Sequence, residues 1–267
     1  MEICTLTIHT FNTKGVEENN RFEYNFGAHV HWLGPTQTHD SVFGAQYAFD
    51  IDEGPNLILP SDLGASVYYI TNAYNYFLGN AASGGFAGFA FVNLPTPVKL
   101  NEEYGGYGQF SPMSRPLLQF KGNTAHSTAY WNEQAGAIYV GGTLWHEGKG
   151  STLKYNSGRK LERYTCRVDP STTWNWCQRP DYMWMVFEDS KVFLANRGMQ
   201  HWGSRAEVIR AEFHDVGMSS NVFGKVALHD LLINCRSLEH VPASLCPSKT
   251  CQRRDRVFFE YFFGFQW

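Results

Sequence analysis

Short stretches that place an aromatic residue two or three positions before an asparagine recur along this sequence. Four of them are NNRFEYNFGAHV (19–30), NYFLGNAASG (75–84), LLQFKGNTAHS (117–127) and KVFLANRGMQ (191–200). Two later stretches, 208–217 and 227–237, keep the apolar part, so that Phe193, Phe213 and Leu232 are spaced by 20 and then 19 residues. A period of about 20 residues is typical of the coils of a solenoid. We therefore expect these three side chains to stack in one interior column.

The repeat predicts a particular kind of solenoid. Each coil of a parallel β-helix presents short strands whose alternate side chains point inward, and the neighbouring coil covers its backbone hydrogen bonds. Asparagine suits the corner between two strands, because it tolerates left-handed backbone and can bond to the next corner. The predicted corner residues are Asn25, Asn80, Asn123 and Asn196. We expect an all-β protein, a right-handed parallel β-helix (solenoid) with long loop excursions.

The composition favours a single folded β domain. Charged residues make up 18% of the 267 residues and aromatic residues 16%, and 25 glycines and 11 prolines supply turns, so disorder is excluded. The net charge of -3 argues against a nucleic-acid partner. MEICTLTIHT lacks the features of a signal peptide, and no apolar run approaches the roughly 20 residues that cross a membrane. We expect one domain over residues 1–251 and an irregular aromatic tail at 252–267.

The six cysteines favour disulfides over metal. Cys166 and Cys177 bracket a loop, and Cys235, Cys246 and Cys251 lie close together in the sequence. The spacings of 11, 11 and 5 match no zinc signature. Buried free thiols are the alternative to disulfide bridges.

The densest group of carboxylates is DIDEG at residues 50–54. On an extended strand Asp50 and Asp52 would project from the same face. Such a pair can share a proton for acid–base catalysis, or hold calcium through oxygen ligands. The alternative is a solvated loop that leads into Gly54 and Pro55, because nothing nearby completes a site. Asp50 and Asp52 are the catalytic candidates, and calcium has no further support.

Histidines offer a weaker signal for metal. His29 and His31 would share one face of a strand, a spacing compatible with a metal pair, but a third ligand is missing. The two His-Asp dipeptides at 214–215 and 229–230 suit strands rather than the helices of metal phosphohydrolases. We predict no metal site and no cofactor.

Long segments between the repeats, notably 94–116 and 145–182, are the predicted binding surface. Loops on a regular scaffold often form binding sites, and aromatic rings there can stack on sugar faces while basic groups hold carboxylates. The predicted ligand-binding residues are Tyr107, Arg159, Lys160, Arg163, Trp174 and Trp176. The alternative is that the aromatic residues anchor the loops on the solenoid.

Three blocks of sequence resemble a known family. They are VEENNRFEYNFGAHV (16–30), ASVYYITNAYNYFLGNAASGGFAGFAF (65–91) and RPLLQFKGNTAHSTAYWNEQAGAIYV (115–140). All three are similar to the β-helix region of the cell-surface hyaluronidase and cell-migration-inducing hyaluronan-binding protein family, with fibrocystin as a more distant relative. His126 lies in the last block, and we favour a structural role for it, hydrogen-bonding a neighbouring coil.

The resemblance implies a module for recognising or scaffolding an acidic, hyaluronan-like polysaccharide, outside the cell or at its surface. The alternative that it implies is a hyaluronidase-like enzyme that cleaves glycosides with paired carboxylates such as Asp50 and Asp52. The family's G8 module and first coils have no counterpart here, so we expect the chain to be truncated at its N-terminal side relative to the family. An exposed solenoid end then predicts self-association.

Overall fold

The computed structural model describes residues 15–30, 66–94, 97, 112–128, 136–146, 153–156, 184–201, 205–222 and 225–235. Strands account for most of this part of the chain, and its helical structure is one short 3-10 turn, η3 (Pro112–Ser114). No helix in these ranges is long and apolar enough to cross a membrane. The predicted domain end at residue 251 and the aromatic tail lie outside the described residues.

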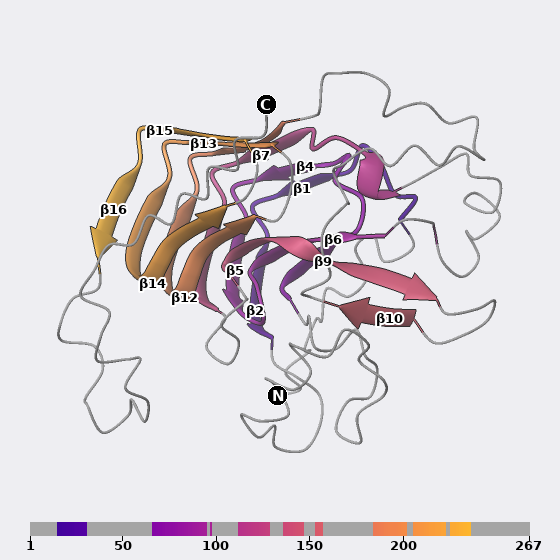
Figure 1. Cartoon of the computed structure of the whole chain (residues 1–267), viewed down its shortest axis with the longest axis horizontal. Helices are drawn as coiled ribbons and strands as arrows, with labels where there is room; N and C mark the ends of the chain where they lie inside the picture. Colours follow the sequence, from indigo (N-terminus) through magenta and orange to yellow (C-terminus); the bar gives the residue numbers. More distant parts are fainter. Residues whose placement is uncertain are drawn as a thin grey trace, which may run out of the picture.

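A first sheet runs the length of the molecule as six parallel strands. In order these are β1 (Arg21–Glu23), β4 (Tyr76–Leu78), β7 (Gln119–Lys121), β11 (Met185–Glu188), β13 (Arg205–Ile209) and β15 (Lys225–His229). Each strand comes from a different pass of the chain, so each marks one coil, numbered 1 to 6 in this order (Figure 1).

A second sheet lies next to the first along the chain. Its parallel strands are β2 (Phe26–Val30), β5 (Ala81–Gly84), β8 (Thr124–Thr128), the first half of β12 (Lys191–His201), the first half of β14 (Glu212–Val222), and β16 (Leu232–Cys235). β12 and β14 bend at Leu194 and Asp215, whose φ angles are 51° and 50°. Their second halves therefore leave this sheet.

A third sheet completes the coils. It contains β3 (Tyr68–Ile70), β6 (Phe89–Asn93), β9 (Ile138–His146) and the second halves of β12 and β14, all parallel. β10 (Leu153–Asn156) adds an antiparallel strand to β9. Parallel strands stacked coil on coil make a parallel β-helix, which confirms the predicted fold (Figure 1).

The interior of the solenoid is filled by columns of side chains in register. Beneath the first sheet the column consists of Phe22, Phe77, Phe120, Phe187, Val208 and Leu228. The ring centroids of Phe22 and Phe77 are 5.1 Å apart and those of Phe120 and Phe187 are 5.2 Å apart. Because alternate residues of a strand face inward, one buried aromatic position per strand is enough to build this core.

The corner between the first and second sheets has the same two-residue form in all six coils. Its first residue has left-handed backbone, with φ between 50° and 70°: Tyr24, Gly79, Gly122, Asp189, Arg210 and Asp230. The backbone N–H of this residue donates to the next coil, as in Tyr24 to the Leu78 carbonyl oxygen at 2.9 Å. The second residue is Asn25, Asn80, Asn123, Ser190, Ala211 or Leu231.

Three of the four predicted corner asparagines are confirmed. Asn25, Asn80 and Asn123 are the second corner residue in coils 1 to 3. The left-handed backbone that we expected of them lies instead at the residue before each. The prediction for Asn196 is wrong, since this residue lies within β12 and Ser190 occupies the corner of coil 4. The stretch at 191–200 resembles the earlier repeats in composition, but the strand that aligns with them is β11.

The predicted interior column is wrong by one residue in two of its three members. Phe213 is buried and aligns with Val192 and Ile233, so these three form the column. Phe193 is half-buried beside His214 on the outward side, and Leu232 is 54% exposed. Side chains alternate along a strand, so a shift of one residue moves them to the opposite face. The solenoid itself is retained, because the strands still pair coil to coil.

Candidate functional site

The three longest connections of the solenoid all meet the third sheet or the strand added to it. Residues 31–65 lead into β3, residues 95–111 follow β6, and residues 157–183 follow β10. The corner between the first and second sheets, by contrast, is two residues long in every coil. The side of the solenoid formed by the third sheet is therefore where long segments can build a binding surface.

Both faces of the third sheet are buried in β3, β6 and the start of β9. Tyr68 and Ile70 face the core, and Tyr69 between them, on the outward side, is only 3% exposed. Tyr139 occupies the same outward row in β9 and is completely buried, with Phe86 packed edge-to-face against it at 4.9 Å. Sheets covered on both faces are rigid supports for the loops at their strand ends.

Two polar side chains lie at the ends of adjacent third-sheet strands. Thr71 follows β3 and Asn93 ends β6, and each is 2% exposed. Within the described part of the chain, Oγ1 of Thr71 and Oδ1 of Asn93 have no hydrogen-bond partner. A buried polar atom without a partner costs about 1–3 kcal/mol, so such atoms need an explanation. They offer neutral hydrogen-bonding groups at the place where the chain leaves β6.

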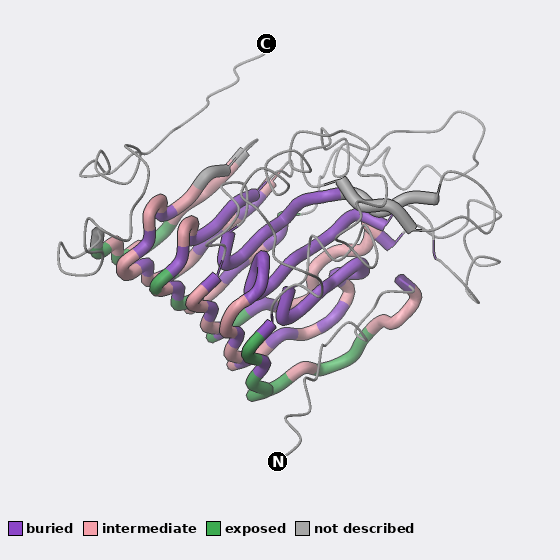
Figure 2. The backbone as a smooth tube through the Cα atoms, turned by 90° about the horizontal axis from the view of Figure 1, so that it is seen from below, coloured by how far each residue is buried: buried purple, intermediate pink, exposed green. Residues whose placement is uncertain are grey.

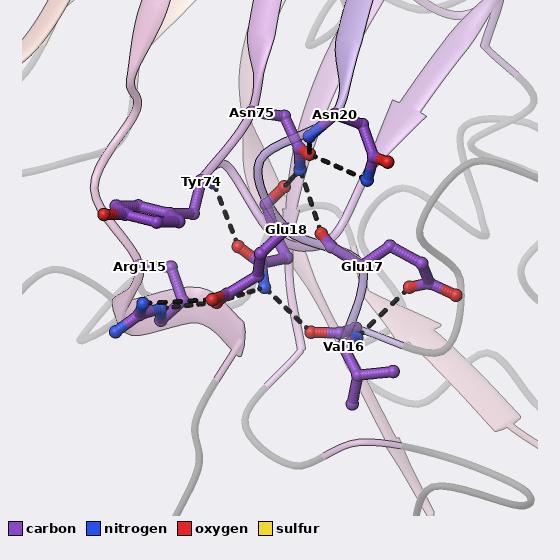
Figure 3. Close-up of polar contacts among 9 residues, drawn as sticks. Val16, Glu17, Glu18, Asn20, Tyr74, Asn75 and Arg115 are labelled. Carbon is purple, nitrogen blue, oxygen red and sulfur yellow. Dashed lines mark hydrogen bonds and ion pairs between the residues drawn. The ribbon is translucent and has the colours of Figure 1, made fainter.

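A clamp fixes the start of coil 1 beside the third sheet (Figure 3). Arg115 binds the carboxylate of Glu18 through two nitrogens, with Nε to Oε1 at 2.5 Å and Nη2 to Oε2 at 3.1 Å. Its guanidinium also lies over the ring of Tyr74 at 4.6 Å. Nδ2 of Asn72 donates to the same carboxylate at 3.0 Å. Sequence reasoning missed this clamp, although Glu18 lies in the acidic segment that precedes β1.

His126 lies on the outward side of the second sheet and contacts the next coil, as expected, but through its ring. It stacks on Phe193 with ring centroids 4.5 Å apart. The hydrogen bond expected to the neighbouring coil is instead made within coil 3, between Nδ1 and Oγ of Ser127 at 3.1 Å. Partial burial lowers the pKa of His126. Rings stacked along the solenoid axis expose their edges, so this pair is a packing contact rather than a sugar platform.

Charged side chains lie beside the corner between the first and second sheets in coils 3 to 5. Arg210 donates to Asp189 through Nε at 2.6 Å and Nη2 at 3.2 Å, and Nζ of Lys121 lies 3.7 Å from the same carboxylate. On the second sheet, Lys191 and Glu212 are paired at 3.2 Å. These exposed pairs join adjacent coils, and each contributes little on its own.

The predicted ligand-binding and catalytic residues lie outside the described residues and stay predictions. They are Asp50, Asp52, Tyr107, Arg159, Lys160, Arg163, Trp174 and Trp176. His31 also lies outside, whereas His29 occupies a bend of β2 with φ of 62°. No cluster of three or more His, Cys, Asp or Glu that could hold a metal occurs in the described ranges. Cys235 lies in β16, and the other cysteines fall outside those ranges.

The fold and its corners define the class of this protein, a parallel β-helix module whose longest connections begin or end at strands of the third sheet or at β10. Residues 8–132 match the family described as the CEMIP beta-helix. This match spans just under half of the chain and confirms the resemblance of residues 8–132 to that family.

Similar proteins occur in Dictyostelium discoideum. A G8 domain-containing protein is 40% identical over 226 residues, which are 84% of this chain and 15% of that protein. Communication mutant protein F is 39% identical over 84% of this chain and 19% of its own length. Protein rliB is 38% identical over 82% of this chain and 18% of its own length. The chain therefore spans less than a fifth of the length of these relatives.

Proposed function

We propose that this β-helix is a recognition module for an acidic, hyaluronan-like polysaccharide, acting outside the cell or at its surface. The observation that carries the proposal is the placement of the long connections, which all meet the third sheet. The similarity of residues 8–132 to the CEMIP beta-helix supports a location outside the cell or at its surface. A scaffold with one insertion-bearing side suits a long polymer, because such a ligand can contact several coils at once.

The chemistry of recognition comes from β10 and the segments on either side of it. Residues 149–167 contain six basic side chains against the single acid Glu162, which makes this segment attractive to a polyanion. Arginine guanidinium groups bind carboxylates in a bidentate manner, and the nearby Trp174 and Trp176 supply flat apolar faces for sugar rings. Charge gives the attraction in this proposal, and ring stacking gives the preference for a sugar.

Titration calorimetry with hyaluronan fragments tests the proposal. Replacing Arg159, Lys160 and Arg163 together by alanine should weaken hyaluronan binding at low salt. High salt should weaken hyaluronan binding by the unchanged protein in the same way, since exposed charges are screened. The matched control is alanine at Arg21, Lys121 and Lys191, which removes three charges from the outward sides of the first and second sheets. The control variant should bind like the parent.

Trp174→Ala and a neutral glycan separate stacking from charge. The tryptophan change should reduce binding to a similar extent at low and high salt, because stacking is not screened. Equal binding of hyaluronan and the neutral glycan, unaffected by the triple replacement, would remove recognition and leave a scaffold. Shortening of hyaluronan that disappears in Asp50→Asn with Asp52→Asn would replace recognition by glycoside cleavage.

A further inference from the structure

Coil 1 is the first of the described coils, and the outer edges of its strands are open among the described residues. β1 is the first strand of the first sheet and β2 is the first of the second, and among the described strands they pair only with β4 and β5. Tyr24 is 83% exposed and Phe26 is 68% exposed, while Asn20 and Asn25 are exposed at the two ends of β1. In Figure 2 a long exposed stretch of backbone lies in the coil nearest the N-terminus.

The asparagines at the corner between the first and second sheets form a ladder of hydrogen bonds from coil to coil, and this ladder has a direction. Oδ1 of Asn80 accepts hydrogen bonds from the backbone N and from Nδ2 of Asn25, both at 3.1 Å. Oδ1 of Asn123 accepts in the same way from Asn80, at 2.9 and 3.0 Å. In each step the later coil supplies the acceptor, and the earlier coil supplies two donors.

The other end of β1 carries a second ladder with the same direction. Oδ1 of Asn75 accepts from the backbone N of Asn20 at 2.8 Å and from its Nδ2 at 3.1 Å (Figure 3). Asparagines of coil 2 and coil 3 also donate back, as Nδ2 of Asn80 does to the Phe22 carbonyl oxygen at 2.8 Å. Each corner asparagine thus binds the coil before it through both ends of its amide.

Coil 1 presents the next acceptors in both ladders. By the same geometry, Oδ1 of Asn20 and Oδ1 of Asn25 face the open edge, five residues apart on either side of β1. The backbone groups on the outer edges of β1 and β2 add a template for a further parallel strand. The edge is therefore matched to a strand with asparagine at both corners and an apolar residue between them.

The opposite end of the solenoid does not supply that match. From coil 4 to coil 6 the corner residue changes to Ser190, Ala211 and Leu231, and Val226 stands where coils 1 and 2 have Asn20 and Asn75. If coil 6 of a second copy stacked on coil 1, only its backbone N–H groups could donate to the side-chain amides of Asn20 and Asn25. Half of the side-chain hydrogen bonds of each ladder step would be lost, so the two ends of one chain are chemically unlike.

We propose that the edge of coil 1 binds a parallel strand of another polypeptide chain, with the pattern Asn-x-Phe-x-x-Asn. The strand adds to β1 by main-chain hydrogen bonds, which provide affinity. Its asparagines donate to Oδ1 of Asn20 and Asn25, which provides selectivity. Its phenylalanine repeats the residue type that coils 1 to 4 place beneath the first sheet.

A fluorescent peptide of residues 74–84, YNYFLGNAASG, carries this pattern and serves as the probe. We expect saturable binding to the full chain by fluorescence anisotropy. Loss of two or more side-chain hydrogen bonds should weaken binding about tenfold when both asparagines of the peptide are replaced by leucine. The peptide of residues 225–235, which has Val226 and Leu231 at the two positions, is the natural control and should bind as weakly.

Changes in the chain locate the binding edge. Asn20→Ala with Asn25→Ala should weaken the asparagine peptide at least about tenfold, with the circular dichroism spectrum retained. The leucine peptide should be weakened less, because it loses only the hydrogen bonds from its backbone N–H groups. Equal affinity for all three peptides, or no binding at all, would overturn the proposal. The alternative partner is a second copy of the chain, and light scattering tests for it. Assemblies that grow with chain concentration and are not blocked by the asparagine peptide would assign the edge to a second copy.

Discussion

A single residue, Asn123, links three coils at the centre of the corner ladder. Oδ1 of Asn123 accepts two hydrogen bonds from Asn80, and its Nδ2 donates to the Phe77 carbonyl oxygen at 2.7 Å. Its backbone carbonyl accepts from Lys191 of coil 4 at 3.0 Å. The side chain is 1% exposed, so none of these groups can turn to water.

Asn123→Ala should lower the free energy of unfolding by about 2–4 kcal/mol, because it leaves buried donors of Asn80 and the Phe77 carbonyl without partners. Denaturation in urea measures the loss. Asn234→Ala, an exposed asparagine in β16, is the control and should change stability by less than about 0.5 kcal/mol. Equal effects of the two substitutions would show that the ladder adds nothing.

The sequence predicted these corner residues from chemistry that is local. Asparagine can hydrogen-bond from one corner to the next, so Asn25, Asn80 and Asn123 could be found without a structure. Ser190 could not, because the corner of coil 4 has no asparagine to mark it. In coil 1 the repeat is six residues long, from Asn20 before the first-sheet strand to Asn25 at the corner. The position of the aromatic residue alone did not show where each repeat begins.

At the scale of single strands, register decides which aromatic side chain carries the core. Phe213 is buried between Val192 and Ile233, whereas Phe193 contacts His126 on the outward side. Both follow the same apolar pattern in sequence. The sequence could therefore predict the spacing between coils but not which residue of each strand faces inward. The frame is set by pairing with strands more than 60 residues away, as in Lys121 with Glu188.

Phe213→Ala should cost about 3–5 kcal/mol of stability, as expected for a large buried side chain, whereas Phe193→Ala should cost about 1 kcal/mol from its stacking contact. Thermal unfolding of the two variants measures the difference. Leu232→Ala serves as the exposed control. The reverse order, with Phe193→Ala the more damaging, would restore the column predicted from the sequence spacing.

The ion pair at the corner of coils 4 and 5 makes a pH-dependent contribution. The Arg210 guanidinium, which hydrogen-bonds Asp189, lowers the pKa of that carboxyl, and Lys121 assists. A lowered folded-state pKa stabilises the protein above the carboxyl's unfolded pKa, and this stability is lost as pH falls through the folded pKa. Arg210→Gln should therefore flatten the decrease of Tm between about pH 5 and pH 2.

Asp189→Asn supplies the complementary measurement, since it removes the titrating group itself. Tm at each pH, followed by circular dichroism, should fall less steeply in both variants than in the parent. The exposure of the pair keeps the effect small. Variants that both follow the parent curve would show that other carboxyls account for the acid sensitivity.

At the scale of the whole molecule, the sequence predicted the scaffold better than the binding surface. The scaffold repeats, so each coil supports the assignment of the others. Residues 149–167 and Trp174 belong to segments without a counterpart in any other coil, and a period cannot place them. The structure contributed the one constraint that the sequence lacked, namely that the longest of these segments all meet strands of one side.

Unequal insertion lengths have a kinetic consequence. Equivalent corner residues of coils 1 to 3 are 55 and 43 residues apart, and 67 residues separate Lys121 from its partner Glu188 in coil 4. Coils 4 to 6 follow one another at 21 and 20 residues, as Phe187, Val208 and Leu228 show. Closing a loop about three times longer costs about 1 kcal/mol more chain entropy.

Folding should therefore nucleate in coils 4 to 6 and proceed toward coil 1. Val208→Ala is expected to slow refolding, whereas Phe22→Ala should mainly accelerate unfolding. Stopped-flow kinetics of the two variants would reveal the order, and a refolding rate more sensitive to Phe22 than to Val208 would reverse it. During synthesis the first coils would then leave the ribosome well before the segment that starts the structure, so the amino-terminal half waits for the carboxyl-terminal half.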